Sequence, residues 1–146
     1  PIQRTVDTAN IIANELGLSV STNVNIQEIS FGDWDGSTND EVKQKWPSEF
    51  AAWQGSWDVA PPNGESLAEF DERVIRGLYE IVDAHPGKTV AVVSHVMPIR
   101  GIARRAMDGG VSAYWSPQIS PCSITILRFW GNQAAEVITL NSTAHL

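Results

Sequence analysis

The sequence has little cysteine, histidine and positive charge, and each shortage excludes a class of protein. Cys122 is the only cysteine, so the chain can form neither an internal disulfide nor a cysteine-rich zinc site. Ten basic residues stand against seventeen acidic ones, and the net charge of -7 argues against nucleic acid as a partner of the bulk surface. No apolar run approaches membrane-spanning length and the start is not signal-like, so we expect a cytoplasmic protein without a membrane partner.

The 146 residues, 42% of them hydrophobic, are enough for one globular domain with its own core. The chain is organised around the stretch from Lys88 to Arg104. Its apolar run Thr89–Val93 is rich in β-branched residues, which is typical of a parallel strand covered on both faces. Pro98 suits the first position of a helix over Ile99–Met107. His95 lies between them, where open α/β sheets bind ligands, and the alternative is a histidine that only caps the helix or fills a crevice.

The remaining patterns predict an α/β fold with a mostly parallel sheet flanked by helices. Helices are expected at Pro1–Leu16, after the capping box of Thr38 and Glu41, and after the capping box of Ser66 and Glu69. Two further segments, 123–130 and 135–140, read as an antiparallel hairpin near the C-terminus, closed by a tight turn at Gly131-Asn132.

Two charged residues stand out against their local pattern. Arg4 lies in the first turn of its helix, where backbone N–H groups favour an anion, although most arginines there are solvated surface charges. Glu28 shares one face of a predicted strand, Val24–Ser30, with Val24 and Ile26. A carboxylate on an apolar face finds a partner, ends the strand or has a raised pKa, and the pattern leaves these three alternatives open.

Four segments, taken in order, resemble the histidine phosphatase (phosphoglycerate mutase-like) superfamily over nearly the whole chain. The first two are Pro1–Ala9, similar to its SPLxRAxxTA helix start, and Glu28–Gly36, similar to its ExxxGxWEG loop. The other two are Asn63–Ser66 with Phe70 and Arg73, and Val93–His95 with Ile99 and Arg100, similar to its GES…F…R and VSHxxxIR segments. The variant at Ser94–Ile99 is also similar to the phosphatase half of actinobacterial proteins fused to a ribonuclease-H-like domain.

The resemblance implies a pocket at the carboxyl ends of the strands, and assigns roles within it. Arg4 would clamp a phosphoryl group through its guanidinium fork. His95 would donate to the same group and stabilise its transition state, with the backbone N–H of Val96 as a further donor. Glu28 would protonate the leaving oxygen, which requires a raised pKa. The family needs no metal and no cofactor, and its partners are small phosphorylated substrates.

Two departures from the family pattern affect the expected function. Val96 replaces the usual glycine after the second histidine, which narrows the pocket. The RHG segment, which carries the phosphorylated histidine on the first strand, is absent, and His85 and His145 are unsuitable substitutes because of their positions. We therefore expect residues 1–146 to be a histidine phosphatase-like domain truncated at its N-terminus, with the first strand absent, and we consider a fused N-terminal domain and a homodimer among its partners.

Three functions follow from these residues. The favoured one is phosphomonoester hydrolysis through a phosphohistidine in the full-length parent, whose nucleophile lies outside this chain. The second is a phosphoglycerate mutase built on the same site. The third is a catalytically inactive module that binds phosphorylated ligands through Arg4 and His95.

Overall fold

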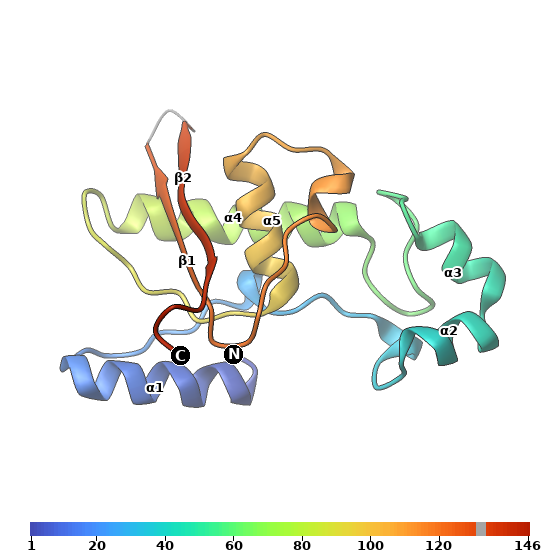
Figure 1. Cartoon of the computed structure of the whole chain (residues 1–146), viewed down its shortest axis with the longest axis horizontal. Helices are drawn as coiled ribbons and strands as arrows, with labels where there is room; N and C mark the ends of the chain where they lie inside the picture. The colour runs from blue at the N-terminus through green and yellow to red at the C-terminus, as the bar shows by residue number, and fades with distance from the viewer. Residues whose placement is uncertain (131–133) are drawn as a thin grey trace.

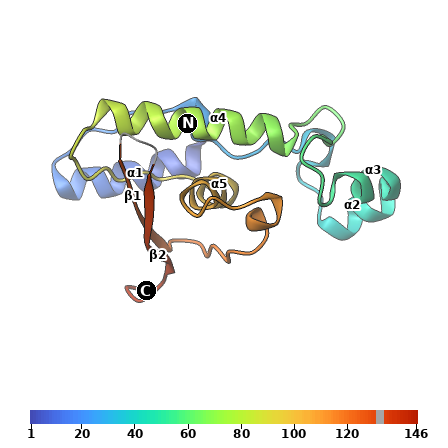
Figure 2. The ribbon, with the colours of Figure 1, turned by 90° about the horizontal axis from the view of Figure 1, so that it is seen from above.

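The computed structural model describes residues 1–130 and 134–146 as an α/β fold. Five α-helices, three short 3₁₀ turns and two strands occur in these residues, and α2 and α3 lie at one end, away from α1 and the hairpin (Figure 1, Figure 2). In chain order the elements are α1 (Gln3–Leu16), η1 (Val24–Ile26), η2 (Gly32–Trp34), α2 (Asn39–Lys45), α3 (Pro47–Trp53), α4 (Leu67–Ala84), α5 (Val96–Ala106), η3 (Val111–Tyr114), β1 (Ile124–Phe129) and β2 (Ala135–Ser142).

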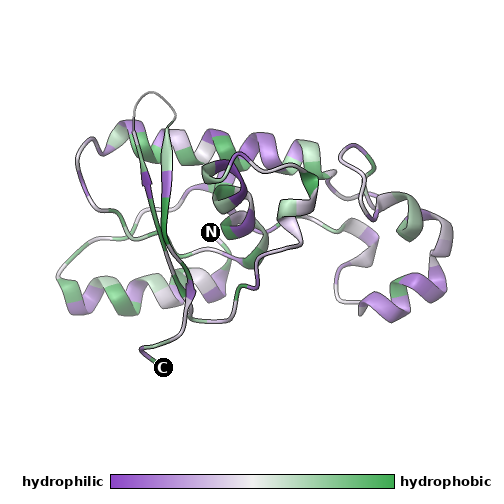
Figure 3. Ribbon diagram, turned by 45° about the horizontal axis from the view of Figure 1, so that its top comes forward, coloured by the Kyte–Doolittle hydropathy of each residue, from purple (hydrophilic) through white to green (hydrophobic). Residues whose placement is uncertain are grey.

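The predicted helices at α1, α2 and α4 are confirmed, although α1 begins at Gln3 rather than at Pro1. The α1 helix ends at Leu16 and is capped by Gly17, whose φ of 65° is left-handed and whose N–H bonds back to the last turn. Thr38 and Ser66 each form a complete capping box, accepting from the backbone N–H three residues on while that residue's carboxylate accepts from the cap. The α2 helix is largely hydrophilic, whereas α4 alternates hydrophobic and hydrophilic residues around its axis (Figure 3).

The main core joins α4 to α5 and to the segment that carries Glu28. Ile29, the neighbour of Glu28, is 3% exposed and packs in one cluster with Met97 of α5. The other members come from α4 and η3: Leu67, Phe70, Val74 and Tyr114. Burial of this cluster therefore fixes the two segments that flank the candidate site.

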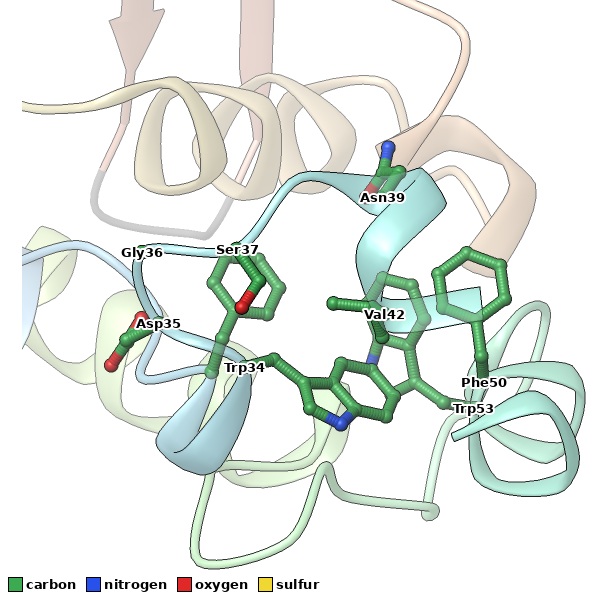
Figure 4. A pocket seen from close by; sticks show the side chains of 9 residues that line it. Trp34, Asp35, Gly36, Ser37, Asn39, Val42, Phe50 and Trp53 are labelled. Carbon is green, nitrogen blue, oxygen red and sulfur yellow. The ribbon is translucent and has the colours of Figure 1, made fainter. Parts of the chain in front are cut away.

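A second cluster, mostly aromatic, packs η2, α2 and α3 together at one end of the molecule. Trp34 and Trp53 meet edge to face with ring centroids 5.6 Å apart, which is a favoured geometry for aromatic pairs. A cavity of about 130 Å³ lies against them, lined partly by Ser37, Asn39 and Phe50 (Figure 4). The tryptophans at 34 and 53 are thus packing residues of this cluster.

The predicted C-terminal hairpin is confirmed. β1 pairs with β2 antiparallel, with register shifts between Ile124 and Leu127. The proposed turn residues Gly131 and Asn132 lie outside the described residues.

The parallel sheet is where prediction and structure differ. Among the described residues the only sheet is the β1–β2 pair, and the Lys88–Val93 segment is assigned to no strand. Val90 and Val92 are 41% and 42% exposed, so the run is not covered on both faces. The physical reason is that a β-strand is defined by hydrogen bonds to a neighbour, and no strand within residues 1–130 and 134–146 pairs with 88–93.

The segment around Glu28 also differs from the predicted strand. Val24–Ile26 is a 3₁₀ turn, in which the Asn23 side chain accepts from the Asn25 N–H, and Val24 is 64% exposed. Val24 therefore does not share a buried face with Glu28. The competing factor is local: asparagine side chains bond to their own backbone and favour turns over strands.

The helix after His95 begins earlier than predicted. α5 begins at Val96, so Pro98 occupies its third position rather than its first. Proline is tolerated there because the first-turn N–H groups have no partner within the helix. The consequence is that His95 itself is the N-cap residue.

Candidate active site

The N-terminus of α5 gathers three of the residues singled out from the sequence. Arg4 comes from the start of α1, His95 caps α5, and Glu28 comes from the irregular segment after η1. The Arg4 Nη2 lies 2.9 Å from Nδ1 of His95. The Glu28 carboxylate accepts hydrogen bonds from the N–H groups of Ile29 and Met97, the latter being the second residue of α5.

The contact with Arg4 determines the tautomer of His95. A guanidinium has only donors, so Nδ1 must accept, and the neutral ring therefore carries its proton on Nε2. That Nε2 is buried and has no hydrogen-bond partner among the described residues. Burial, followed by the charge of Arg4, lowers the pKa of His95 below its ordinary value, which favours this neutral form. His95 thus presents one unpaired N–H donor.

Glu28 has the opposite perturbation. Desolvation raises the pKa of its carboxyl, although the bonds from Ile29 and Met97 and the charges of Arg4 and Arg73 act the other way. A carboxyl with a raised pKa keeps its proton to higher pH, which is the property of a general acid.

Val96 is the first residue of α5 and its side chain is 37% exposed. Its backbone N–H belongs to the helix turn whose donors have no partner inside the helix. With the His95 ring beside it, this end of α5 is suited to an anion.

Sequence reasoning overlooked the residues that hold these groups in place. The Ser94 hydroxyl donates to the carbonyl of Ile26 at 2.6 Å, tying the residue before His95 to η1. Arg73 of α4 donates to the carbonyl of Glu28, and Glu65 bonds both Arg73 and the N–H of Ser30. Arg73 entered the sequence analysis only as part of a motif, because hydrogen bonds to distant carbonyls leave no periodic signal.

A groove runs from His95 between three segments of the chain. Its volume is about 560 Å³, and it is lined by one face of α1, by the extended residues 18–23 and by Lys88–Val93. The face of α1 is the one predicted from its apolar spacing: Val6, Ala9, Ala13 and Leu16. Arg4 and Glu28 are not among the residues that line the groove; His95 is.

Comparison with known proteins identifies the family. The family model described as histidine phosphatase superfamily (branch 1) matches residues 1–143. This chain belongs to the histidine phosphatase superfamily. The bifunctional protein Rv2228c of Mycobacterium tuberculosis is 35% identical over 146 residues, which are all of this chain and 40% of that protein. Phosphoserine phosphatase 1 of Hydrogenobacter thermophilus is 33% identical over 147 residues, covering all of this chain and 69% of that one.

Solved structures agree with this membership. Bacillus stearothermophilus YhfR superposes with a TM-score of 0.86 and 28% identity over 98% of this chain and 71% of its own. This chain therefore spans about 40% of the mycobacterial relative and about 70% of the other two proteins. In the part of the chain that the structure describes, no helix is long and apolar enough to cross a membrane.

Proposed function

We propose that this chain belongs to a cytoplasmic phosphomonoesterase that hydrolyses small phosphorylated substrates through a phosphohistidine intermediate. The observation that carries the proposal is the meeting of Arg4, His95 and Glu28 at the N-terminus of α5. Family membership supports it, and the relative named phosphoserine phosphatase 1 matches over the whole chain.

In this proposal the phosphoryl group binds between Arg4 and the end of α5. The unpaired Nε2–H of His95 donates to one equatorial oxygen, and Arg4, which is exposed and now bonded to His95, turns its fork toward the others. The N–H of Val96 adds a donor from the helix end. Donors fixed in this way stabilise the charge that spreads over the phosphoryl oxygens in the transition state.

Glu28 then acts as the general acid in the first step and as the general base in the second. A histidine nitrogen attacks phosphorus, the bond from phosphorus to the leaving oxygen breaks, and the protonated carboxyl of Glu28 gives its proton to that oxygen. In the second step water attacks the phosphohistidine, the Glu28 carboxylate takes a proton from that water, and the phosphorus–nitrogen bond breaks. Its raised pKa suits the first step and its bonds to the Ile29 and Met97 N–H groups suit the charged form between the steps.

The attacking histidine is proposed to come from outside residues 1–146, on a strand that lies in the groove. The groove exposes the extended segment 88–93 and the apolar face of α1, and it ends at His95. A strand placed there would pair with Lys88–Val93, create the parallel sheet that the sequence predicts, and bring its end to the site. Residues 1–146 are thus proposed to be an N-terminally truncated histidine phosphatase-like domain.

A fused N-terminal domain is proposed as well. The mycobacterial relative is called bifunctional and this chain covers 40% of it, which leaves room for a second domain. Ribonuclease-H-like is the type that the sequence resemblance suggests.

The test uses the full-length natural protein that contains this chain. We expect it to release inorganic phosphate from phosphomonoesters, and His95→Ala and Arg4→Ala to abolish most of the release. Interconversion of phosphoglycerates without phosphate release would assign the chain to the mutases. Binding of phosphate without turnover would assign it to inactive binding modules.

A further inference from the structure

The partly buried Arg73 guanidinium lies against the segment that carries Glu28. Arg73 projects from α4, and its side chain is 14% exposed. It donates to the carbonyls of Asn25, Gln27 and Glu28 at 2.9, 3.0 and 2.9 Å. Its remaining two donors bind Glu65 at 2.5 and 2.8 Å. An arginine has five N–H donors, and all are engaged.

The Arg73 donors supply the hydrogen bonds that a neighbouring strand would otherwise give to the backbone carbonyls of this segment. Residues 27–30 belong to no strand or helix, so their carbonyls receive no regular backbone ladder. Three of the four carbonyls from Asn25 to Glu28 instead point at one planar, charged fork, whose geometry a lysine cannot reproduce. The carbonyl that remains, that of Ile26, accepts from Ser94.

Glu65 binds the backbone on the C-terminal side of Glu28, at Ser30. Its backbone N–H donates to the Ser30 carbonyl at 2.9 Å, and its carboxylate accepts from the Ser30 N–H at 3.2 Å. The same carboxylate is bonded to Arg73. The two members of one partly buried ion pair therefore hold the backbone at both ends of a short segment, Arg73 at the Glu28 carbonyl and Glu65 at Ser30.

We infer that Arg73 and Glu65 are positioning residues for Glu28, holding its carboxyl at the N-terminus of α5 where a leaving oxygen is protonated. This inference rests on the proposed function for its chemical consequence. Neither residue touches the phosphoryl group; they act by fixing the backbone from which the acid projects. Because a general acid must lie within hydrogen-bond reach of the oxygen it protonates, a small displacement of Glu28 removes its contribution.

Arg73→Lys is the variant to test, and Arg104→Lys is its matched control. Lysine keeps the charge near Glu65 but cannot reach three carbonyls as well. Arg104 forms an equally buried ion pair with Asp71, with side chains 14% and 13% exposed against 14% and 18% for Arg73 and Glu65. Its other side-chain hydrogen bonds are to the Gly109 carbonyl and to Tyr114, and neither of these residues belongs to the Glu28 segment.

The assay compares a substrate with a poor alkoxide leaving group, glycerol phosphate, with p-nitrophenyl phosphate in the full-length protein. A general acid contributes about 10²- to 10⁴-fold, so Arg73→Lys should slow glycerol phosphate by about 10-fold or more and p-nitrophenyl phosphate by less than about 3-fold. Arg104→Lys should change both rates by the same factor. Adding Arg73→Lys to Glu28→Gln should cost little more. Equal losses on both substrates in Arg73→Lys would make it merely structural and overturn the inference.

A second readout needs no turnover. The pKa of Glu28 can be measured by carbon NMR of labelled glutamate. The Glu28 signal is assigned as the one that disappears in Glu28→Gln. If Arg73 holds this carboxyl in its desolvated place, Arg73→Lys should lower the pKa toward that of an exposed glutamate, while Arg104→Lys leaves it raised. An unchanged pKa in Arg73→Lys would overturn the inference even if no phosphatase activity were found, and absence of activity in the wild type would count against the proposed function alone.

Discussion

Gly32→Ala perturbs the contact that aligns the loop after Glu28 with the loop before α4. Gly32 has a φ of 56°, and a Cβ added to it would lie 2.2 Å from the Pro62 carbonyl oxygen and 2.4 Å from the Gly64 nitrogen. Both atoms are backbone, and the Pro62 carbonyl accepts from the Asp33 N–H at 2.9 Å. The two loops therefore cannot separate without breaking a hydrogen bond and shifting the Ser30–Glu65 pairing beyond it.

Gly36→Ala separates the conformational cost from the steric one. Gly36 has a φ of 81°, and nothing lies within 4 Å of its added Cβ. Left-handed backbone costs an alanine about 1–2 kcal/mol, and the stiffer unfolded chain returns about 0.4–1 kcal/mol. Gly36→Ala should therefore lose about 0–1.6 kcal/mol of unfolding free energy. Overpacking adds about 1–3 kcal/mol in Gly32→Ala, for a total loss of about 1–5 kcal/mol.

Urea unfolding of the full-length protein, followed by tryptophan fluorescence, measures both variants. Trp34 and Trp53 lie in the aromatic cluster next to Gly32, so they report on unfolding of this region. Equal losses of unfolding free energy in Gly32→Ala and Gly36→Ala would refute the reasoning, because the close approach of the two loops would then add nothing to the cost of the Gly32 substitution.

Two further predictions concern the titrating groups. Glu28→Gln should slow poor leaving groups by about 10²-fold or more while p-nitrophenyl phosphate suffers much less, and an equal loss on both, measured by phosphate release, would assign Glu28 to folding instead. His95 has a lowered folded pKa, so its contribution to stability is present above pH 6.5 and is lost as the pH falls through the folded value. The difference in unfolding free energy between wild type and His95→Gln should therefore shrink in acid, and a difference that stays constant with pH would contradict this assignment.

Sequence patterns located most of the helices because their signals are local. The capping boxes at Thr38 and Ser66 depend on residues within one turn, and both were confirmed. The strand prediction at Thr89–Val93 was wrong for the described residues because pairing depends on a distant partner, and the one at Val24–Ser30 was wrong because the Asn23 side chain favours a local turn. Hydrophobicity alone cannot say whether that partner is present.

The sequence predicted which residues form the candidate site, but not the hydrogen bonds that join them. The placement of His95 at a helix start could be read from Thr89–Pro98, and resemblance suggested Arg4 and Glu28 as its companions. Two hydrogen bonds could not be predicted, because each joins segments that are far apart in sequence. They are the bond between Arg4 and His95 and the bond from Arg73 to the Glu28 carbonyl.

Mapping the phosphorylated residue tests the central claim most directly. The full-length protein is incubated briefly with a phosphomonoester, denatured in alkali, in which phosphohistidine survives, and digested for mass spectrometry. The proposal predicts an acid-labile phosphoryl group on a histidine outside residues 1–146, with none on His85, His95 or His145. A phosphoryl group on His95 would contradict the proposal, because His95 would then be the nucleophile and the groove would need no strand to complete the site.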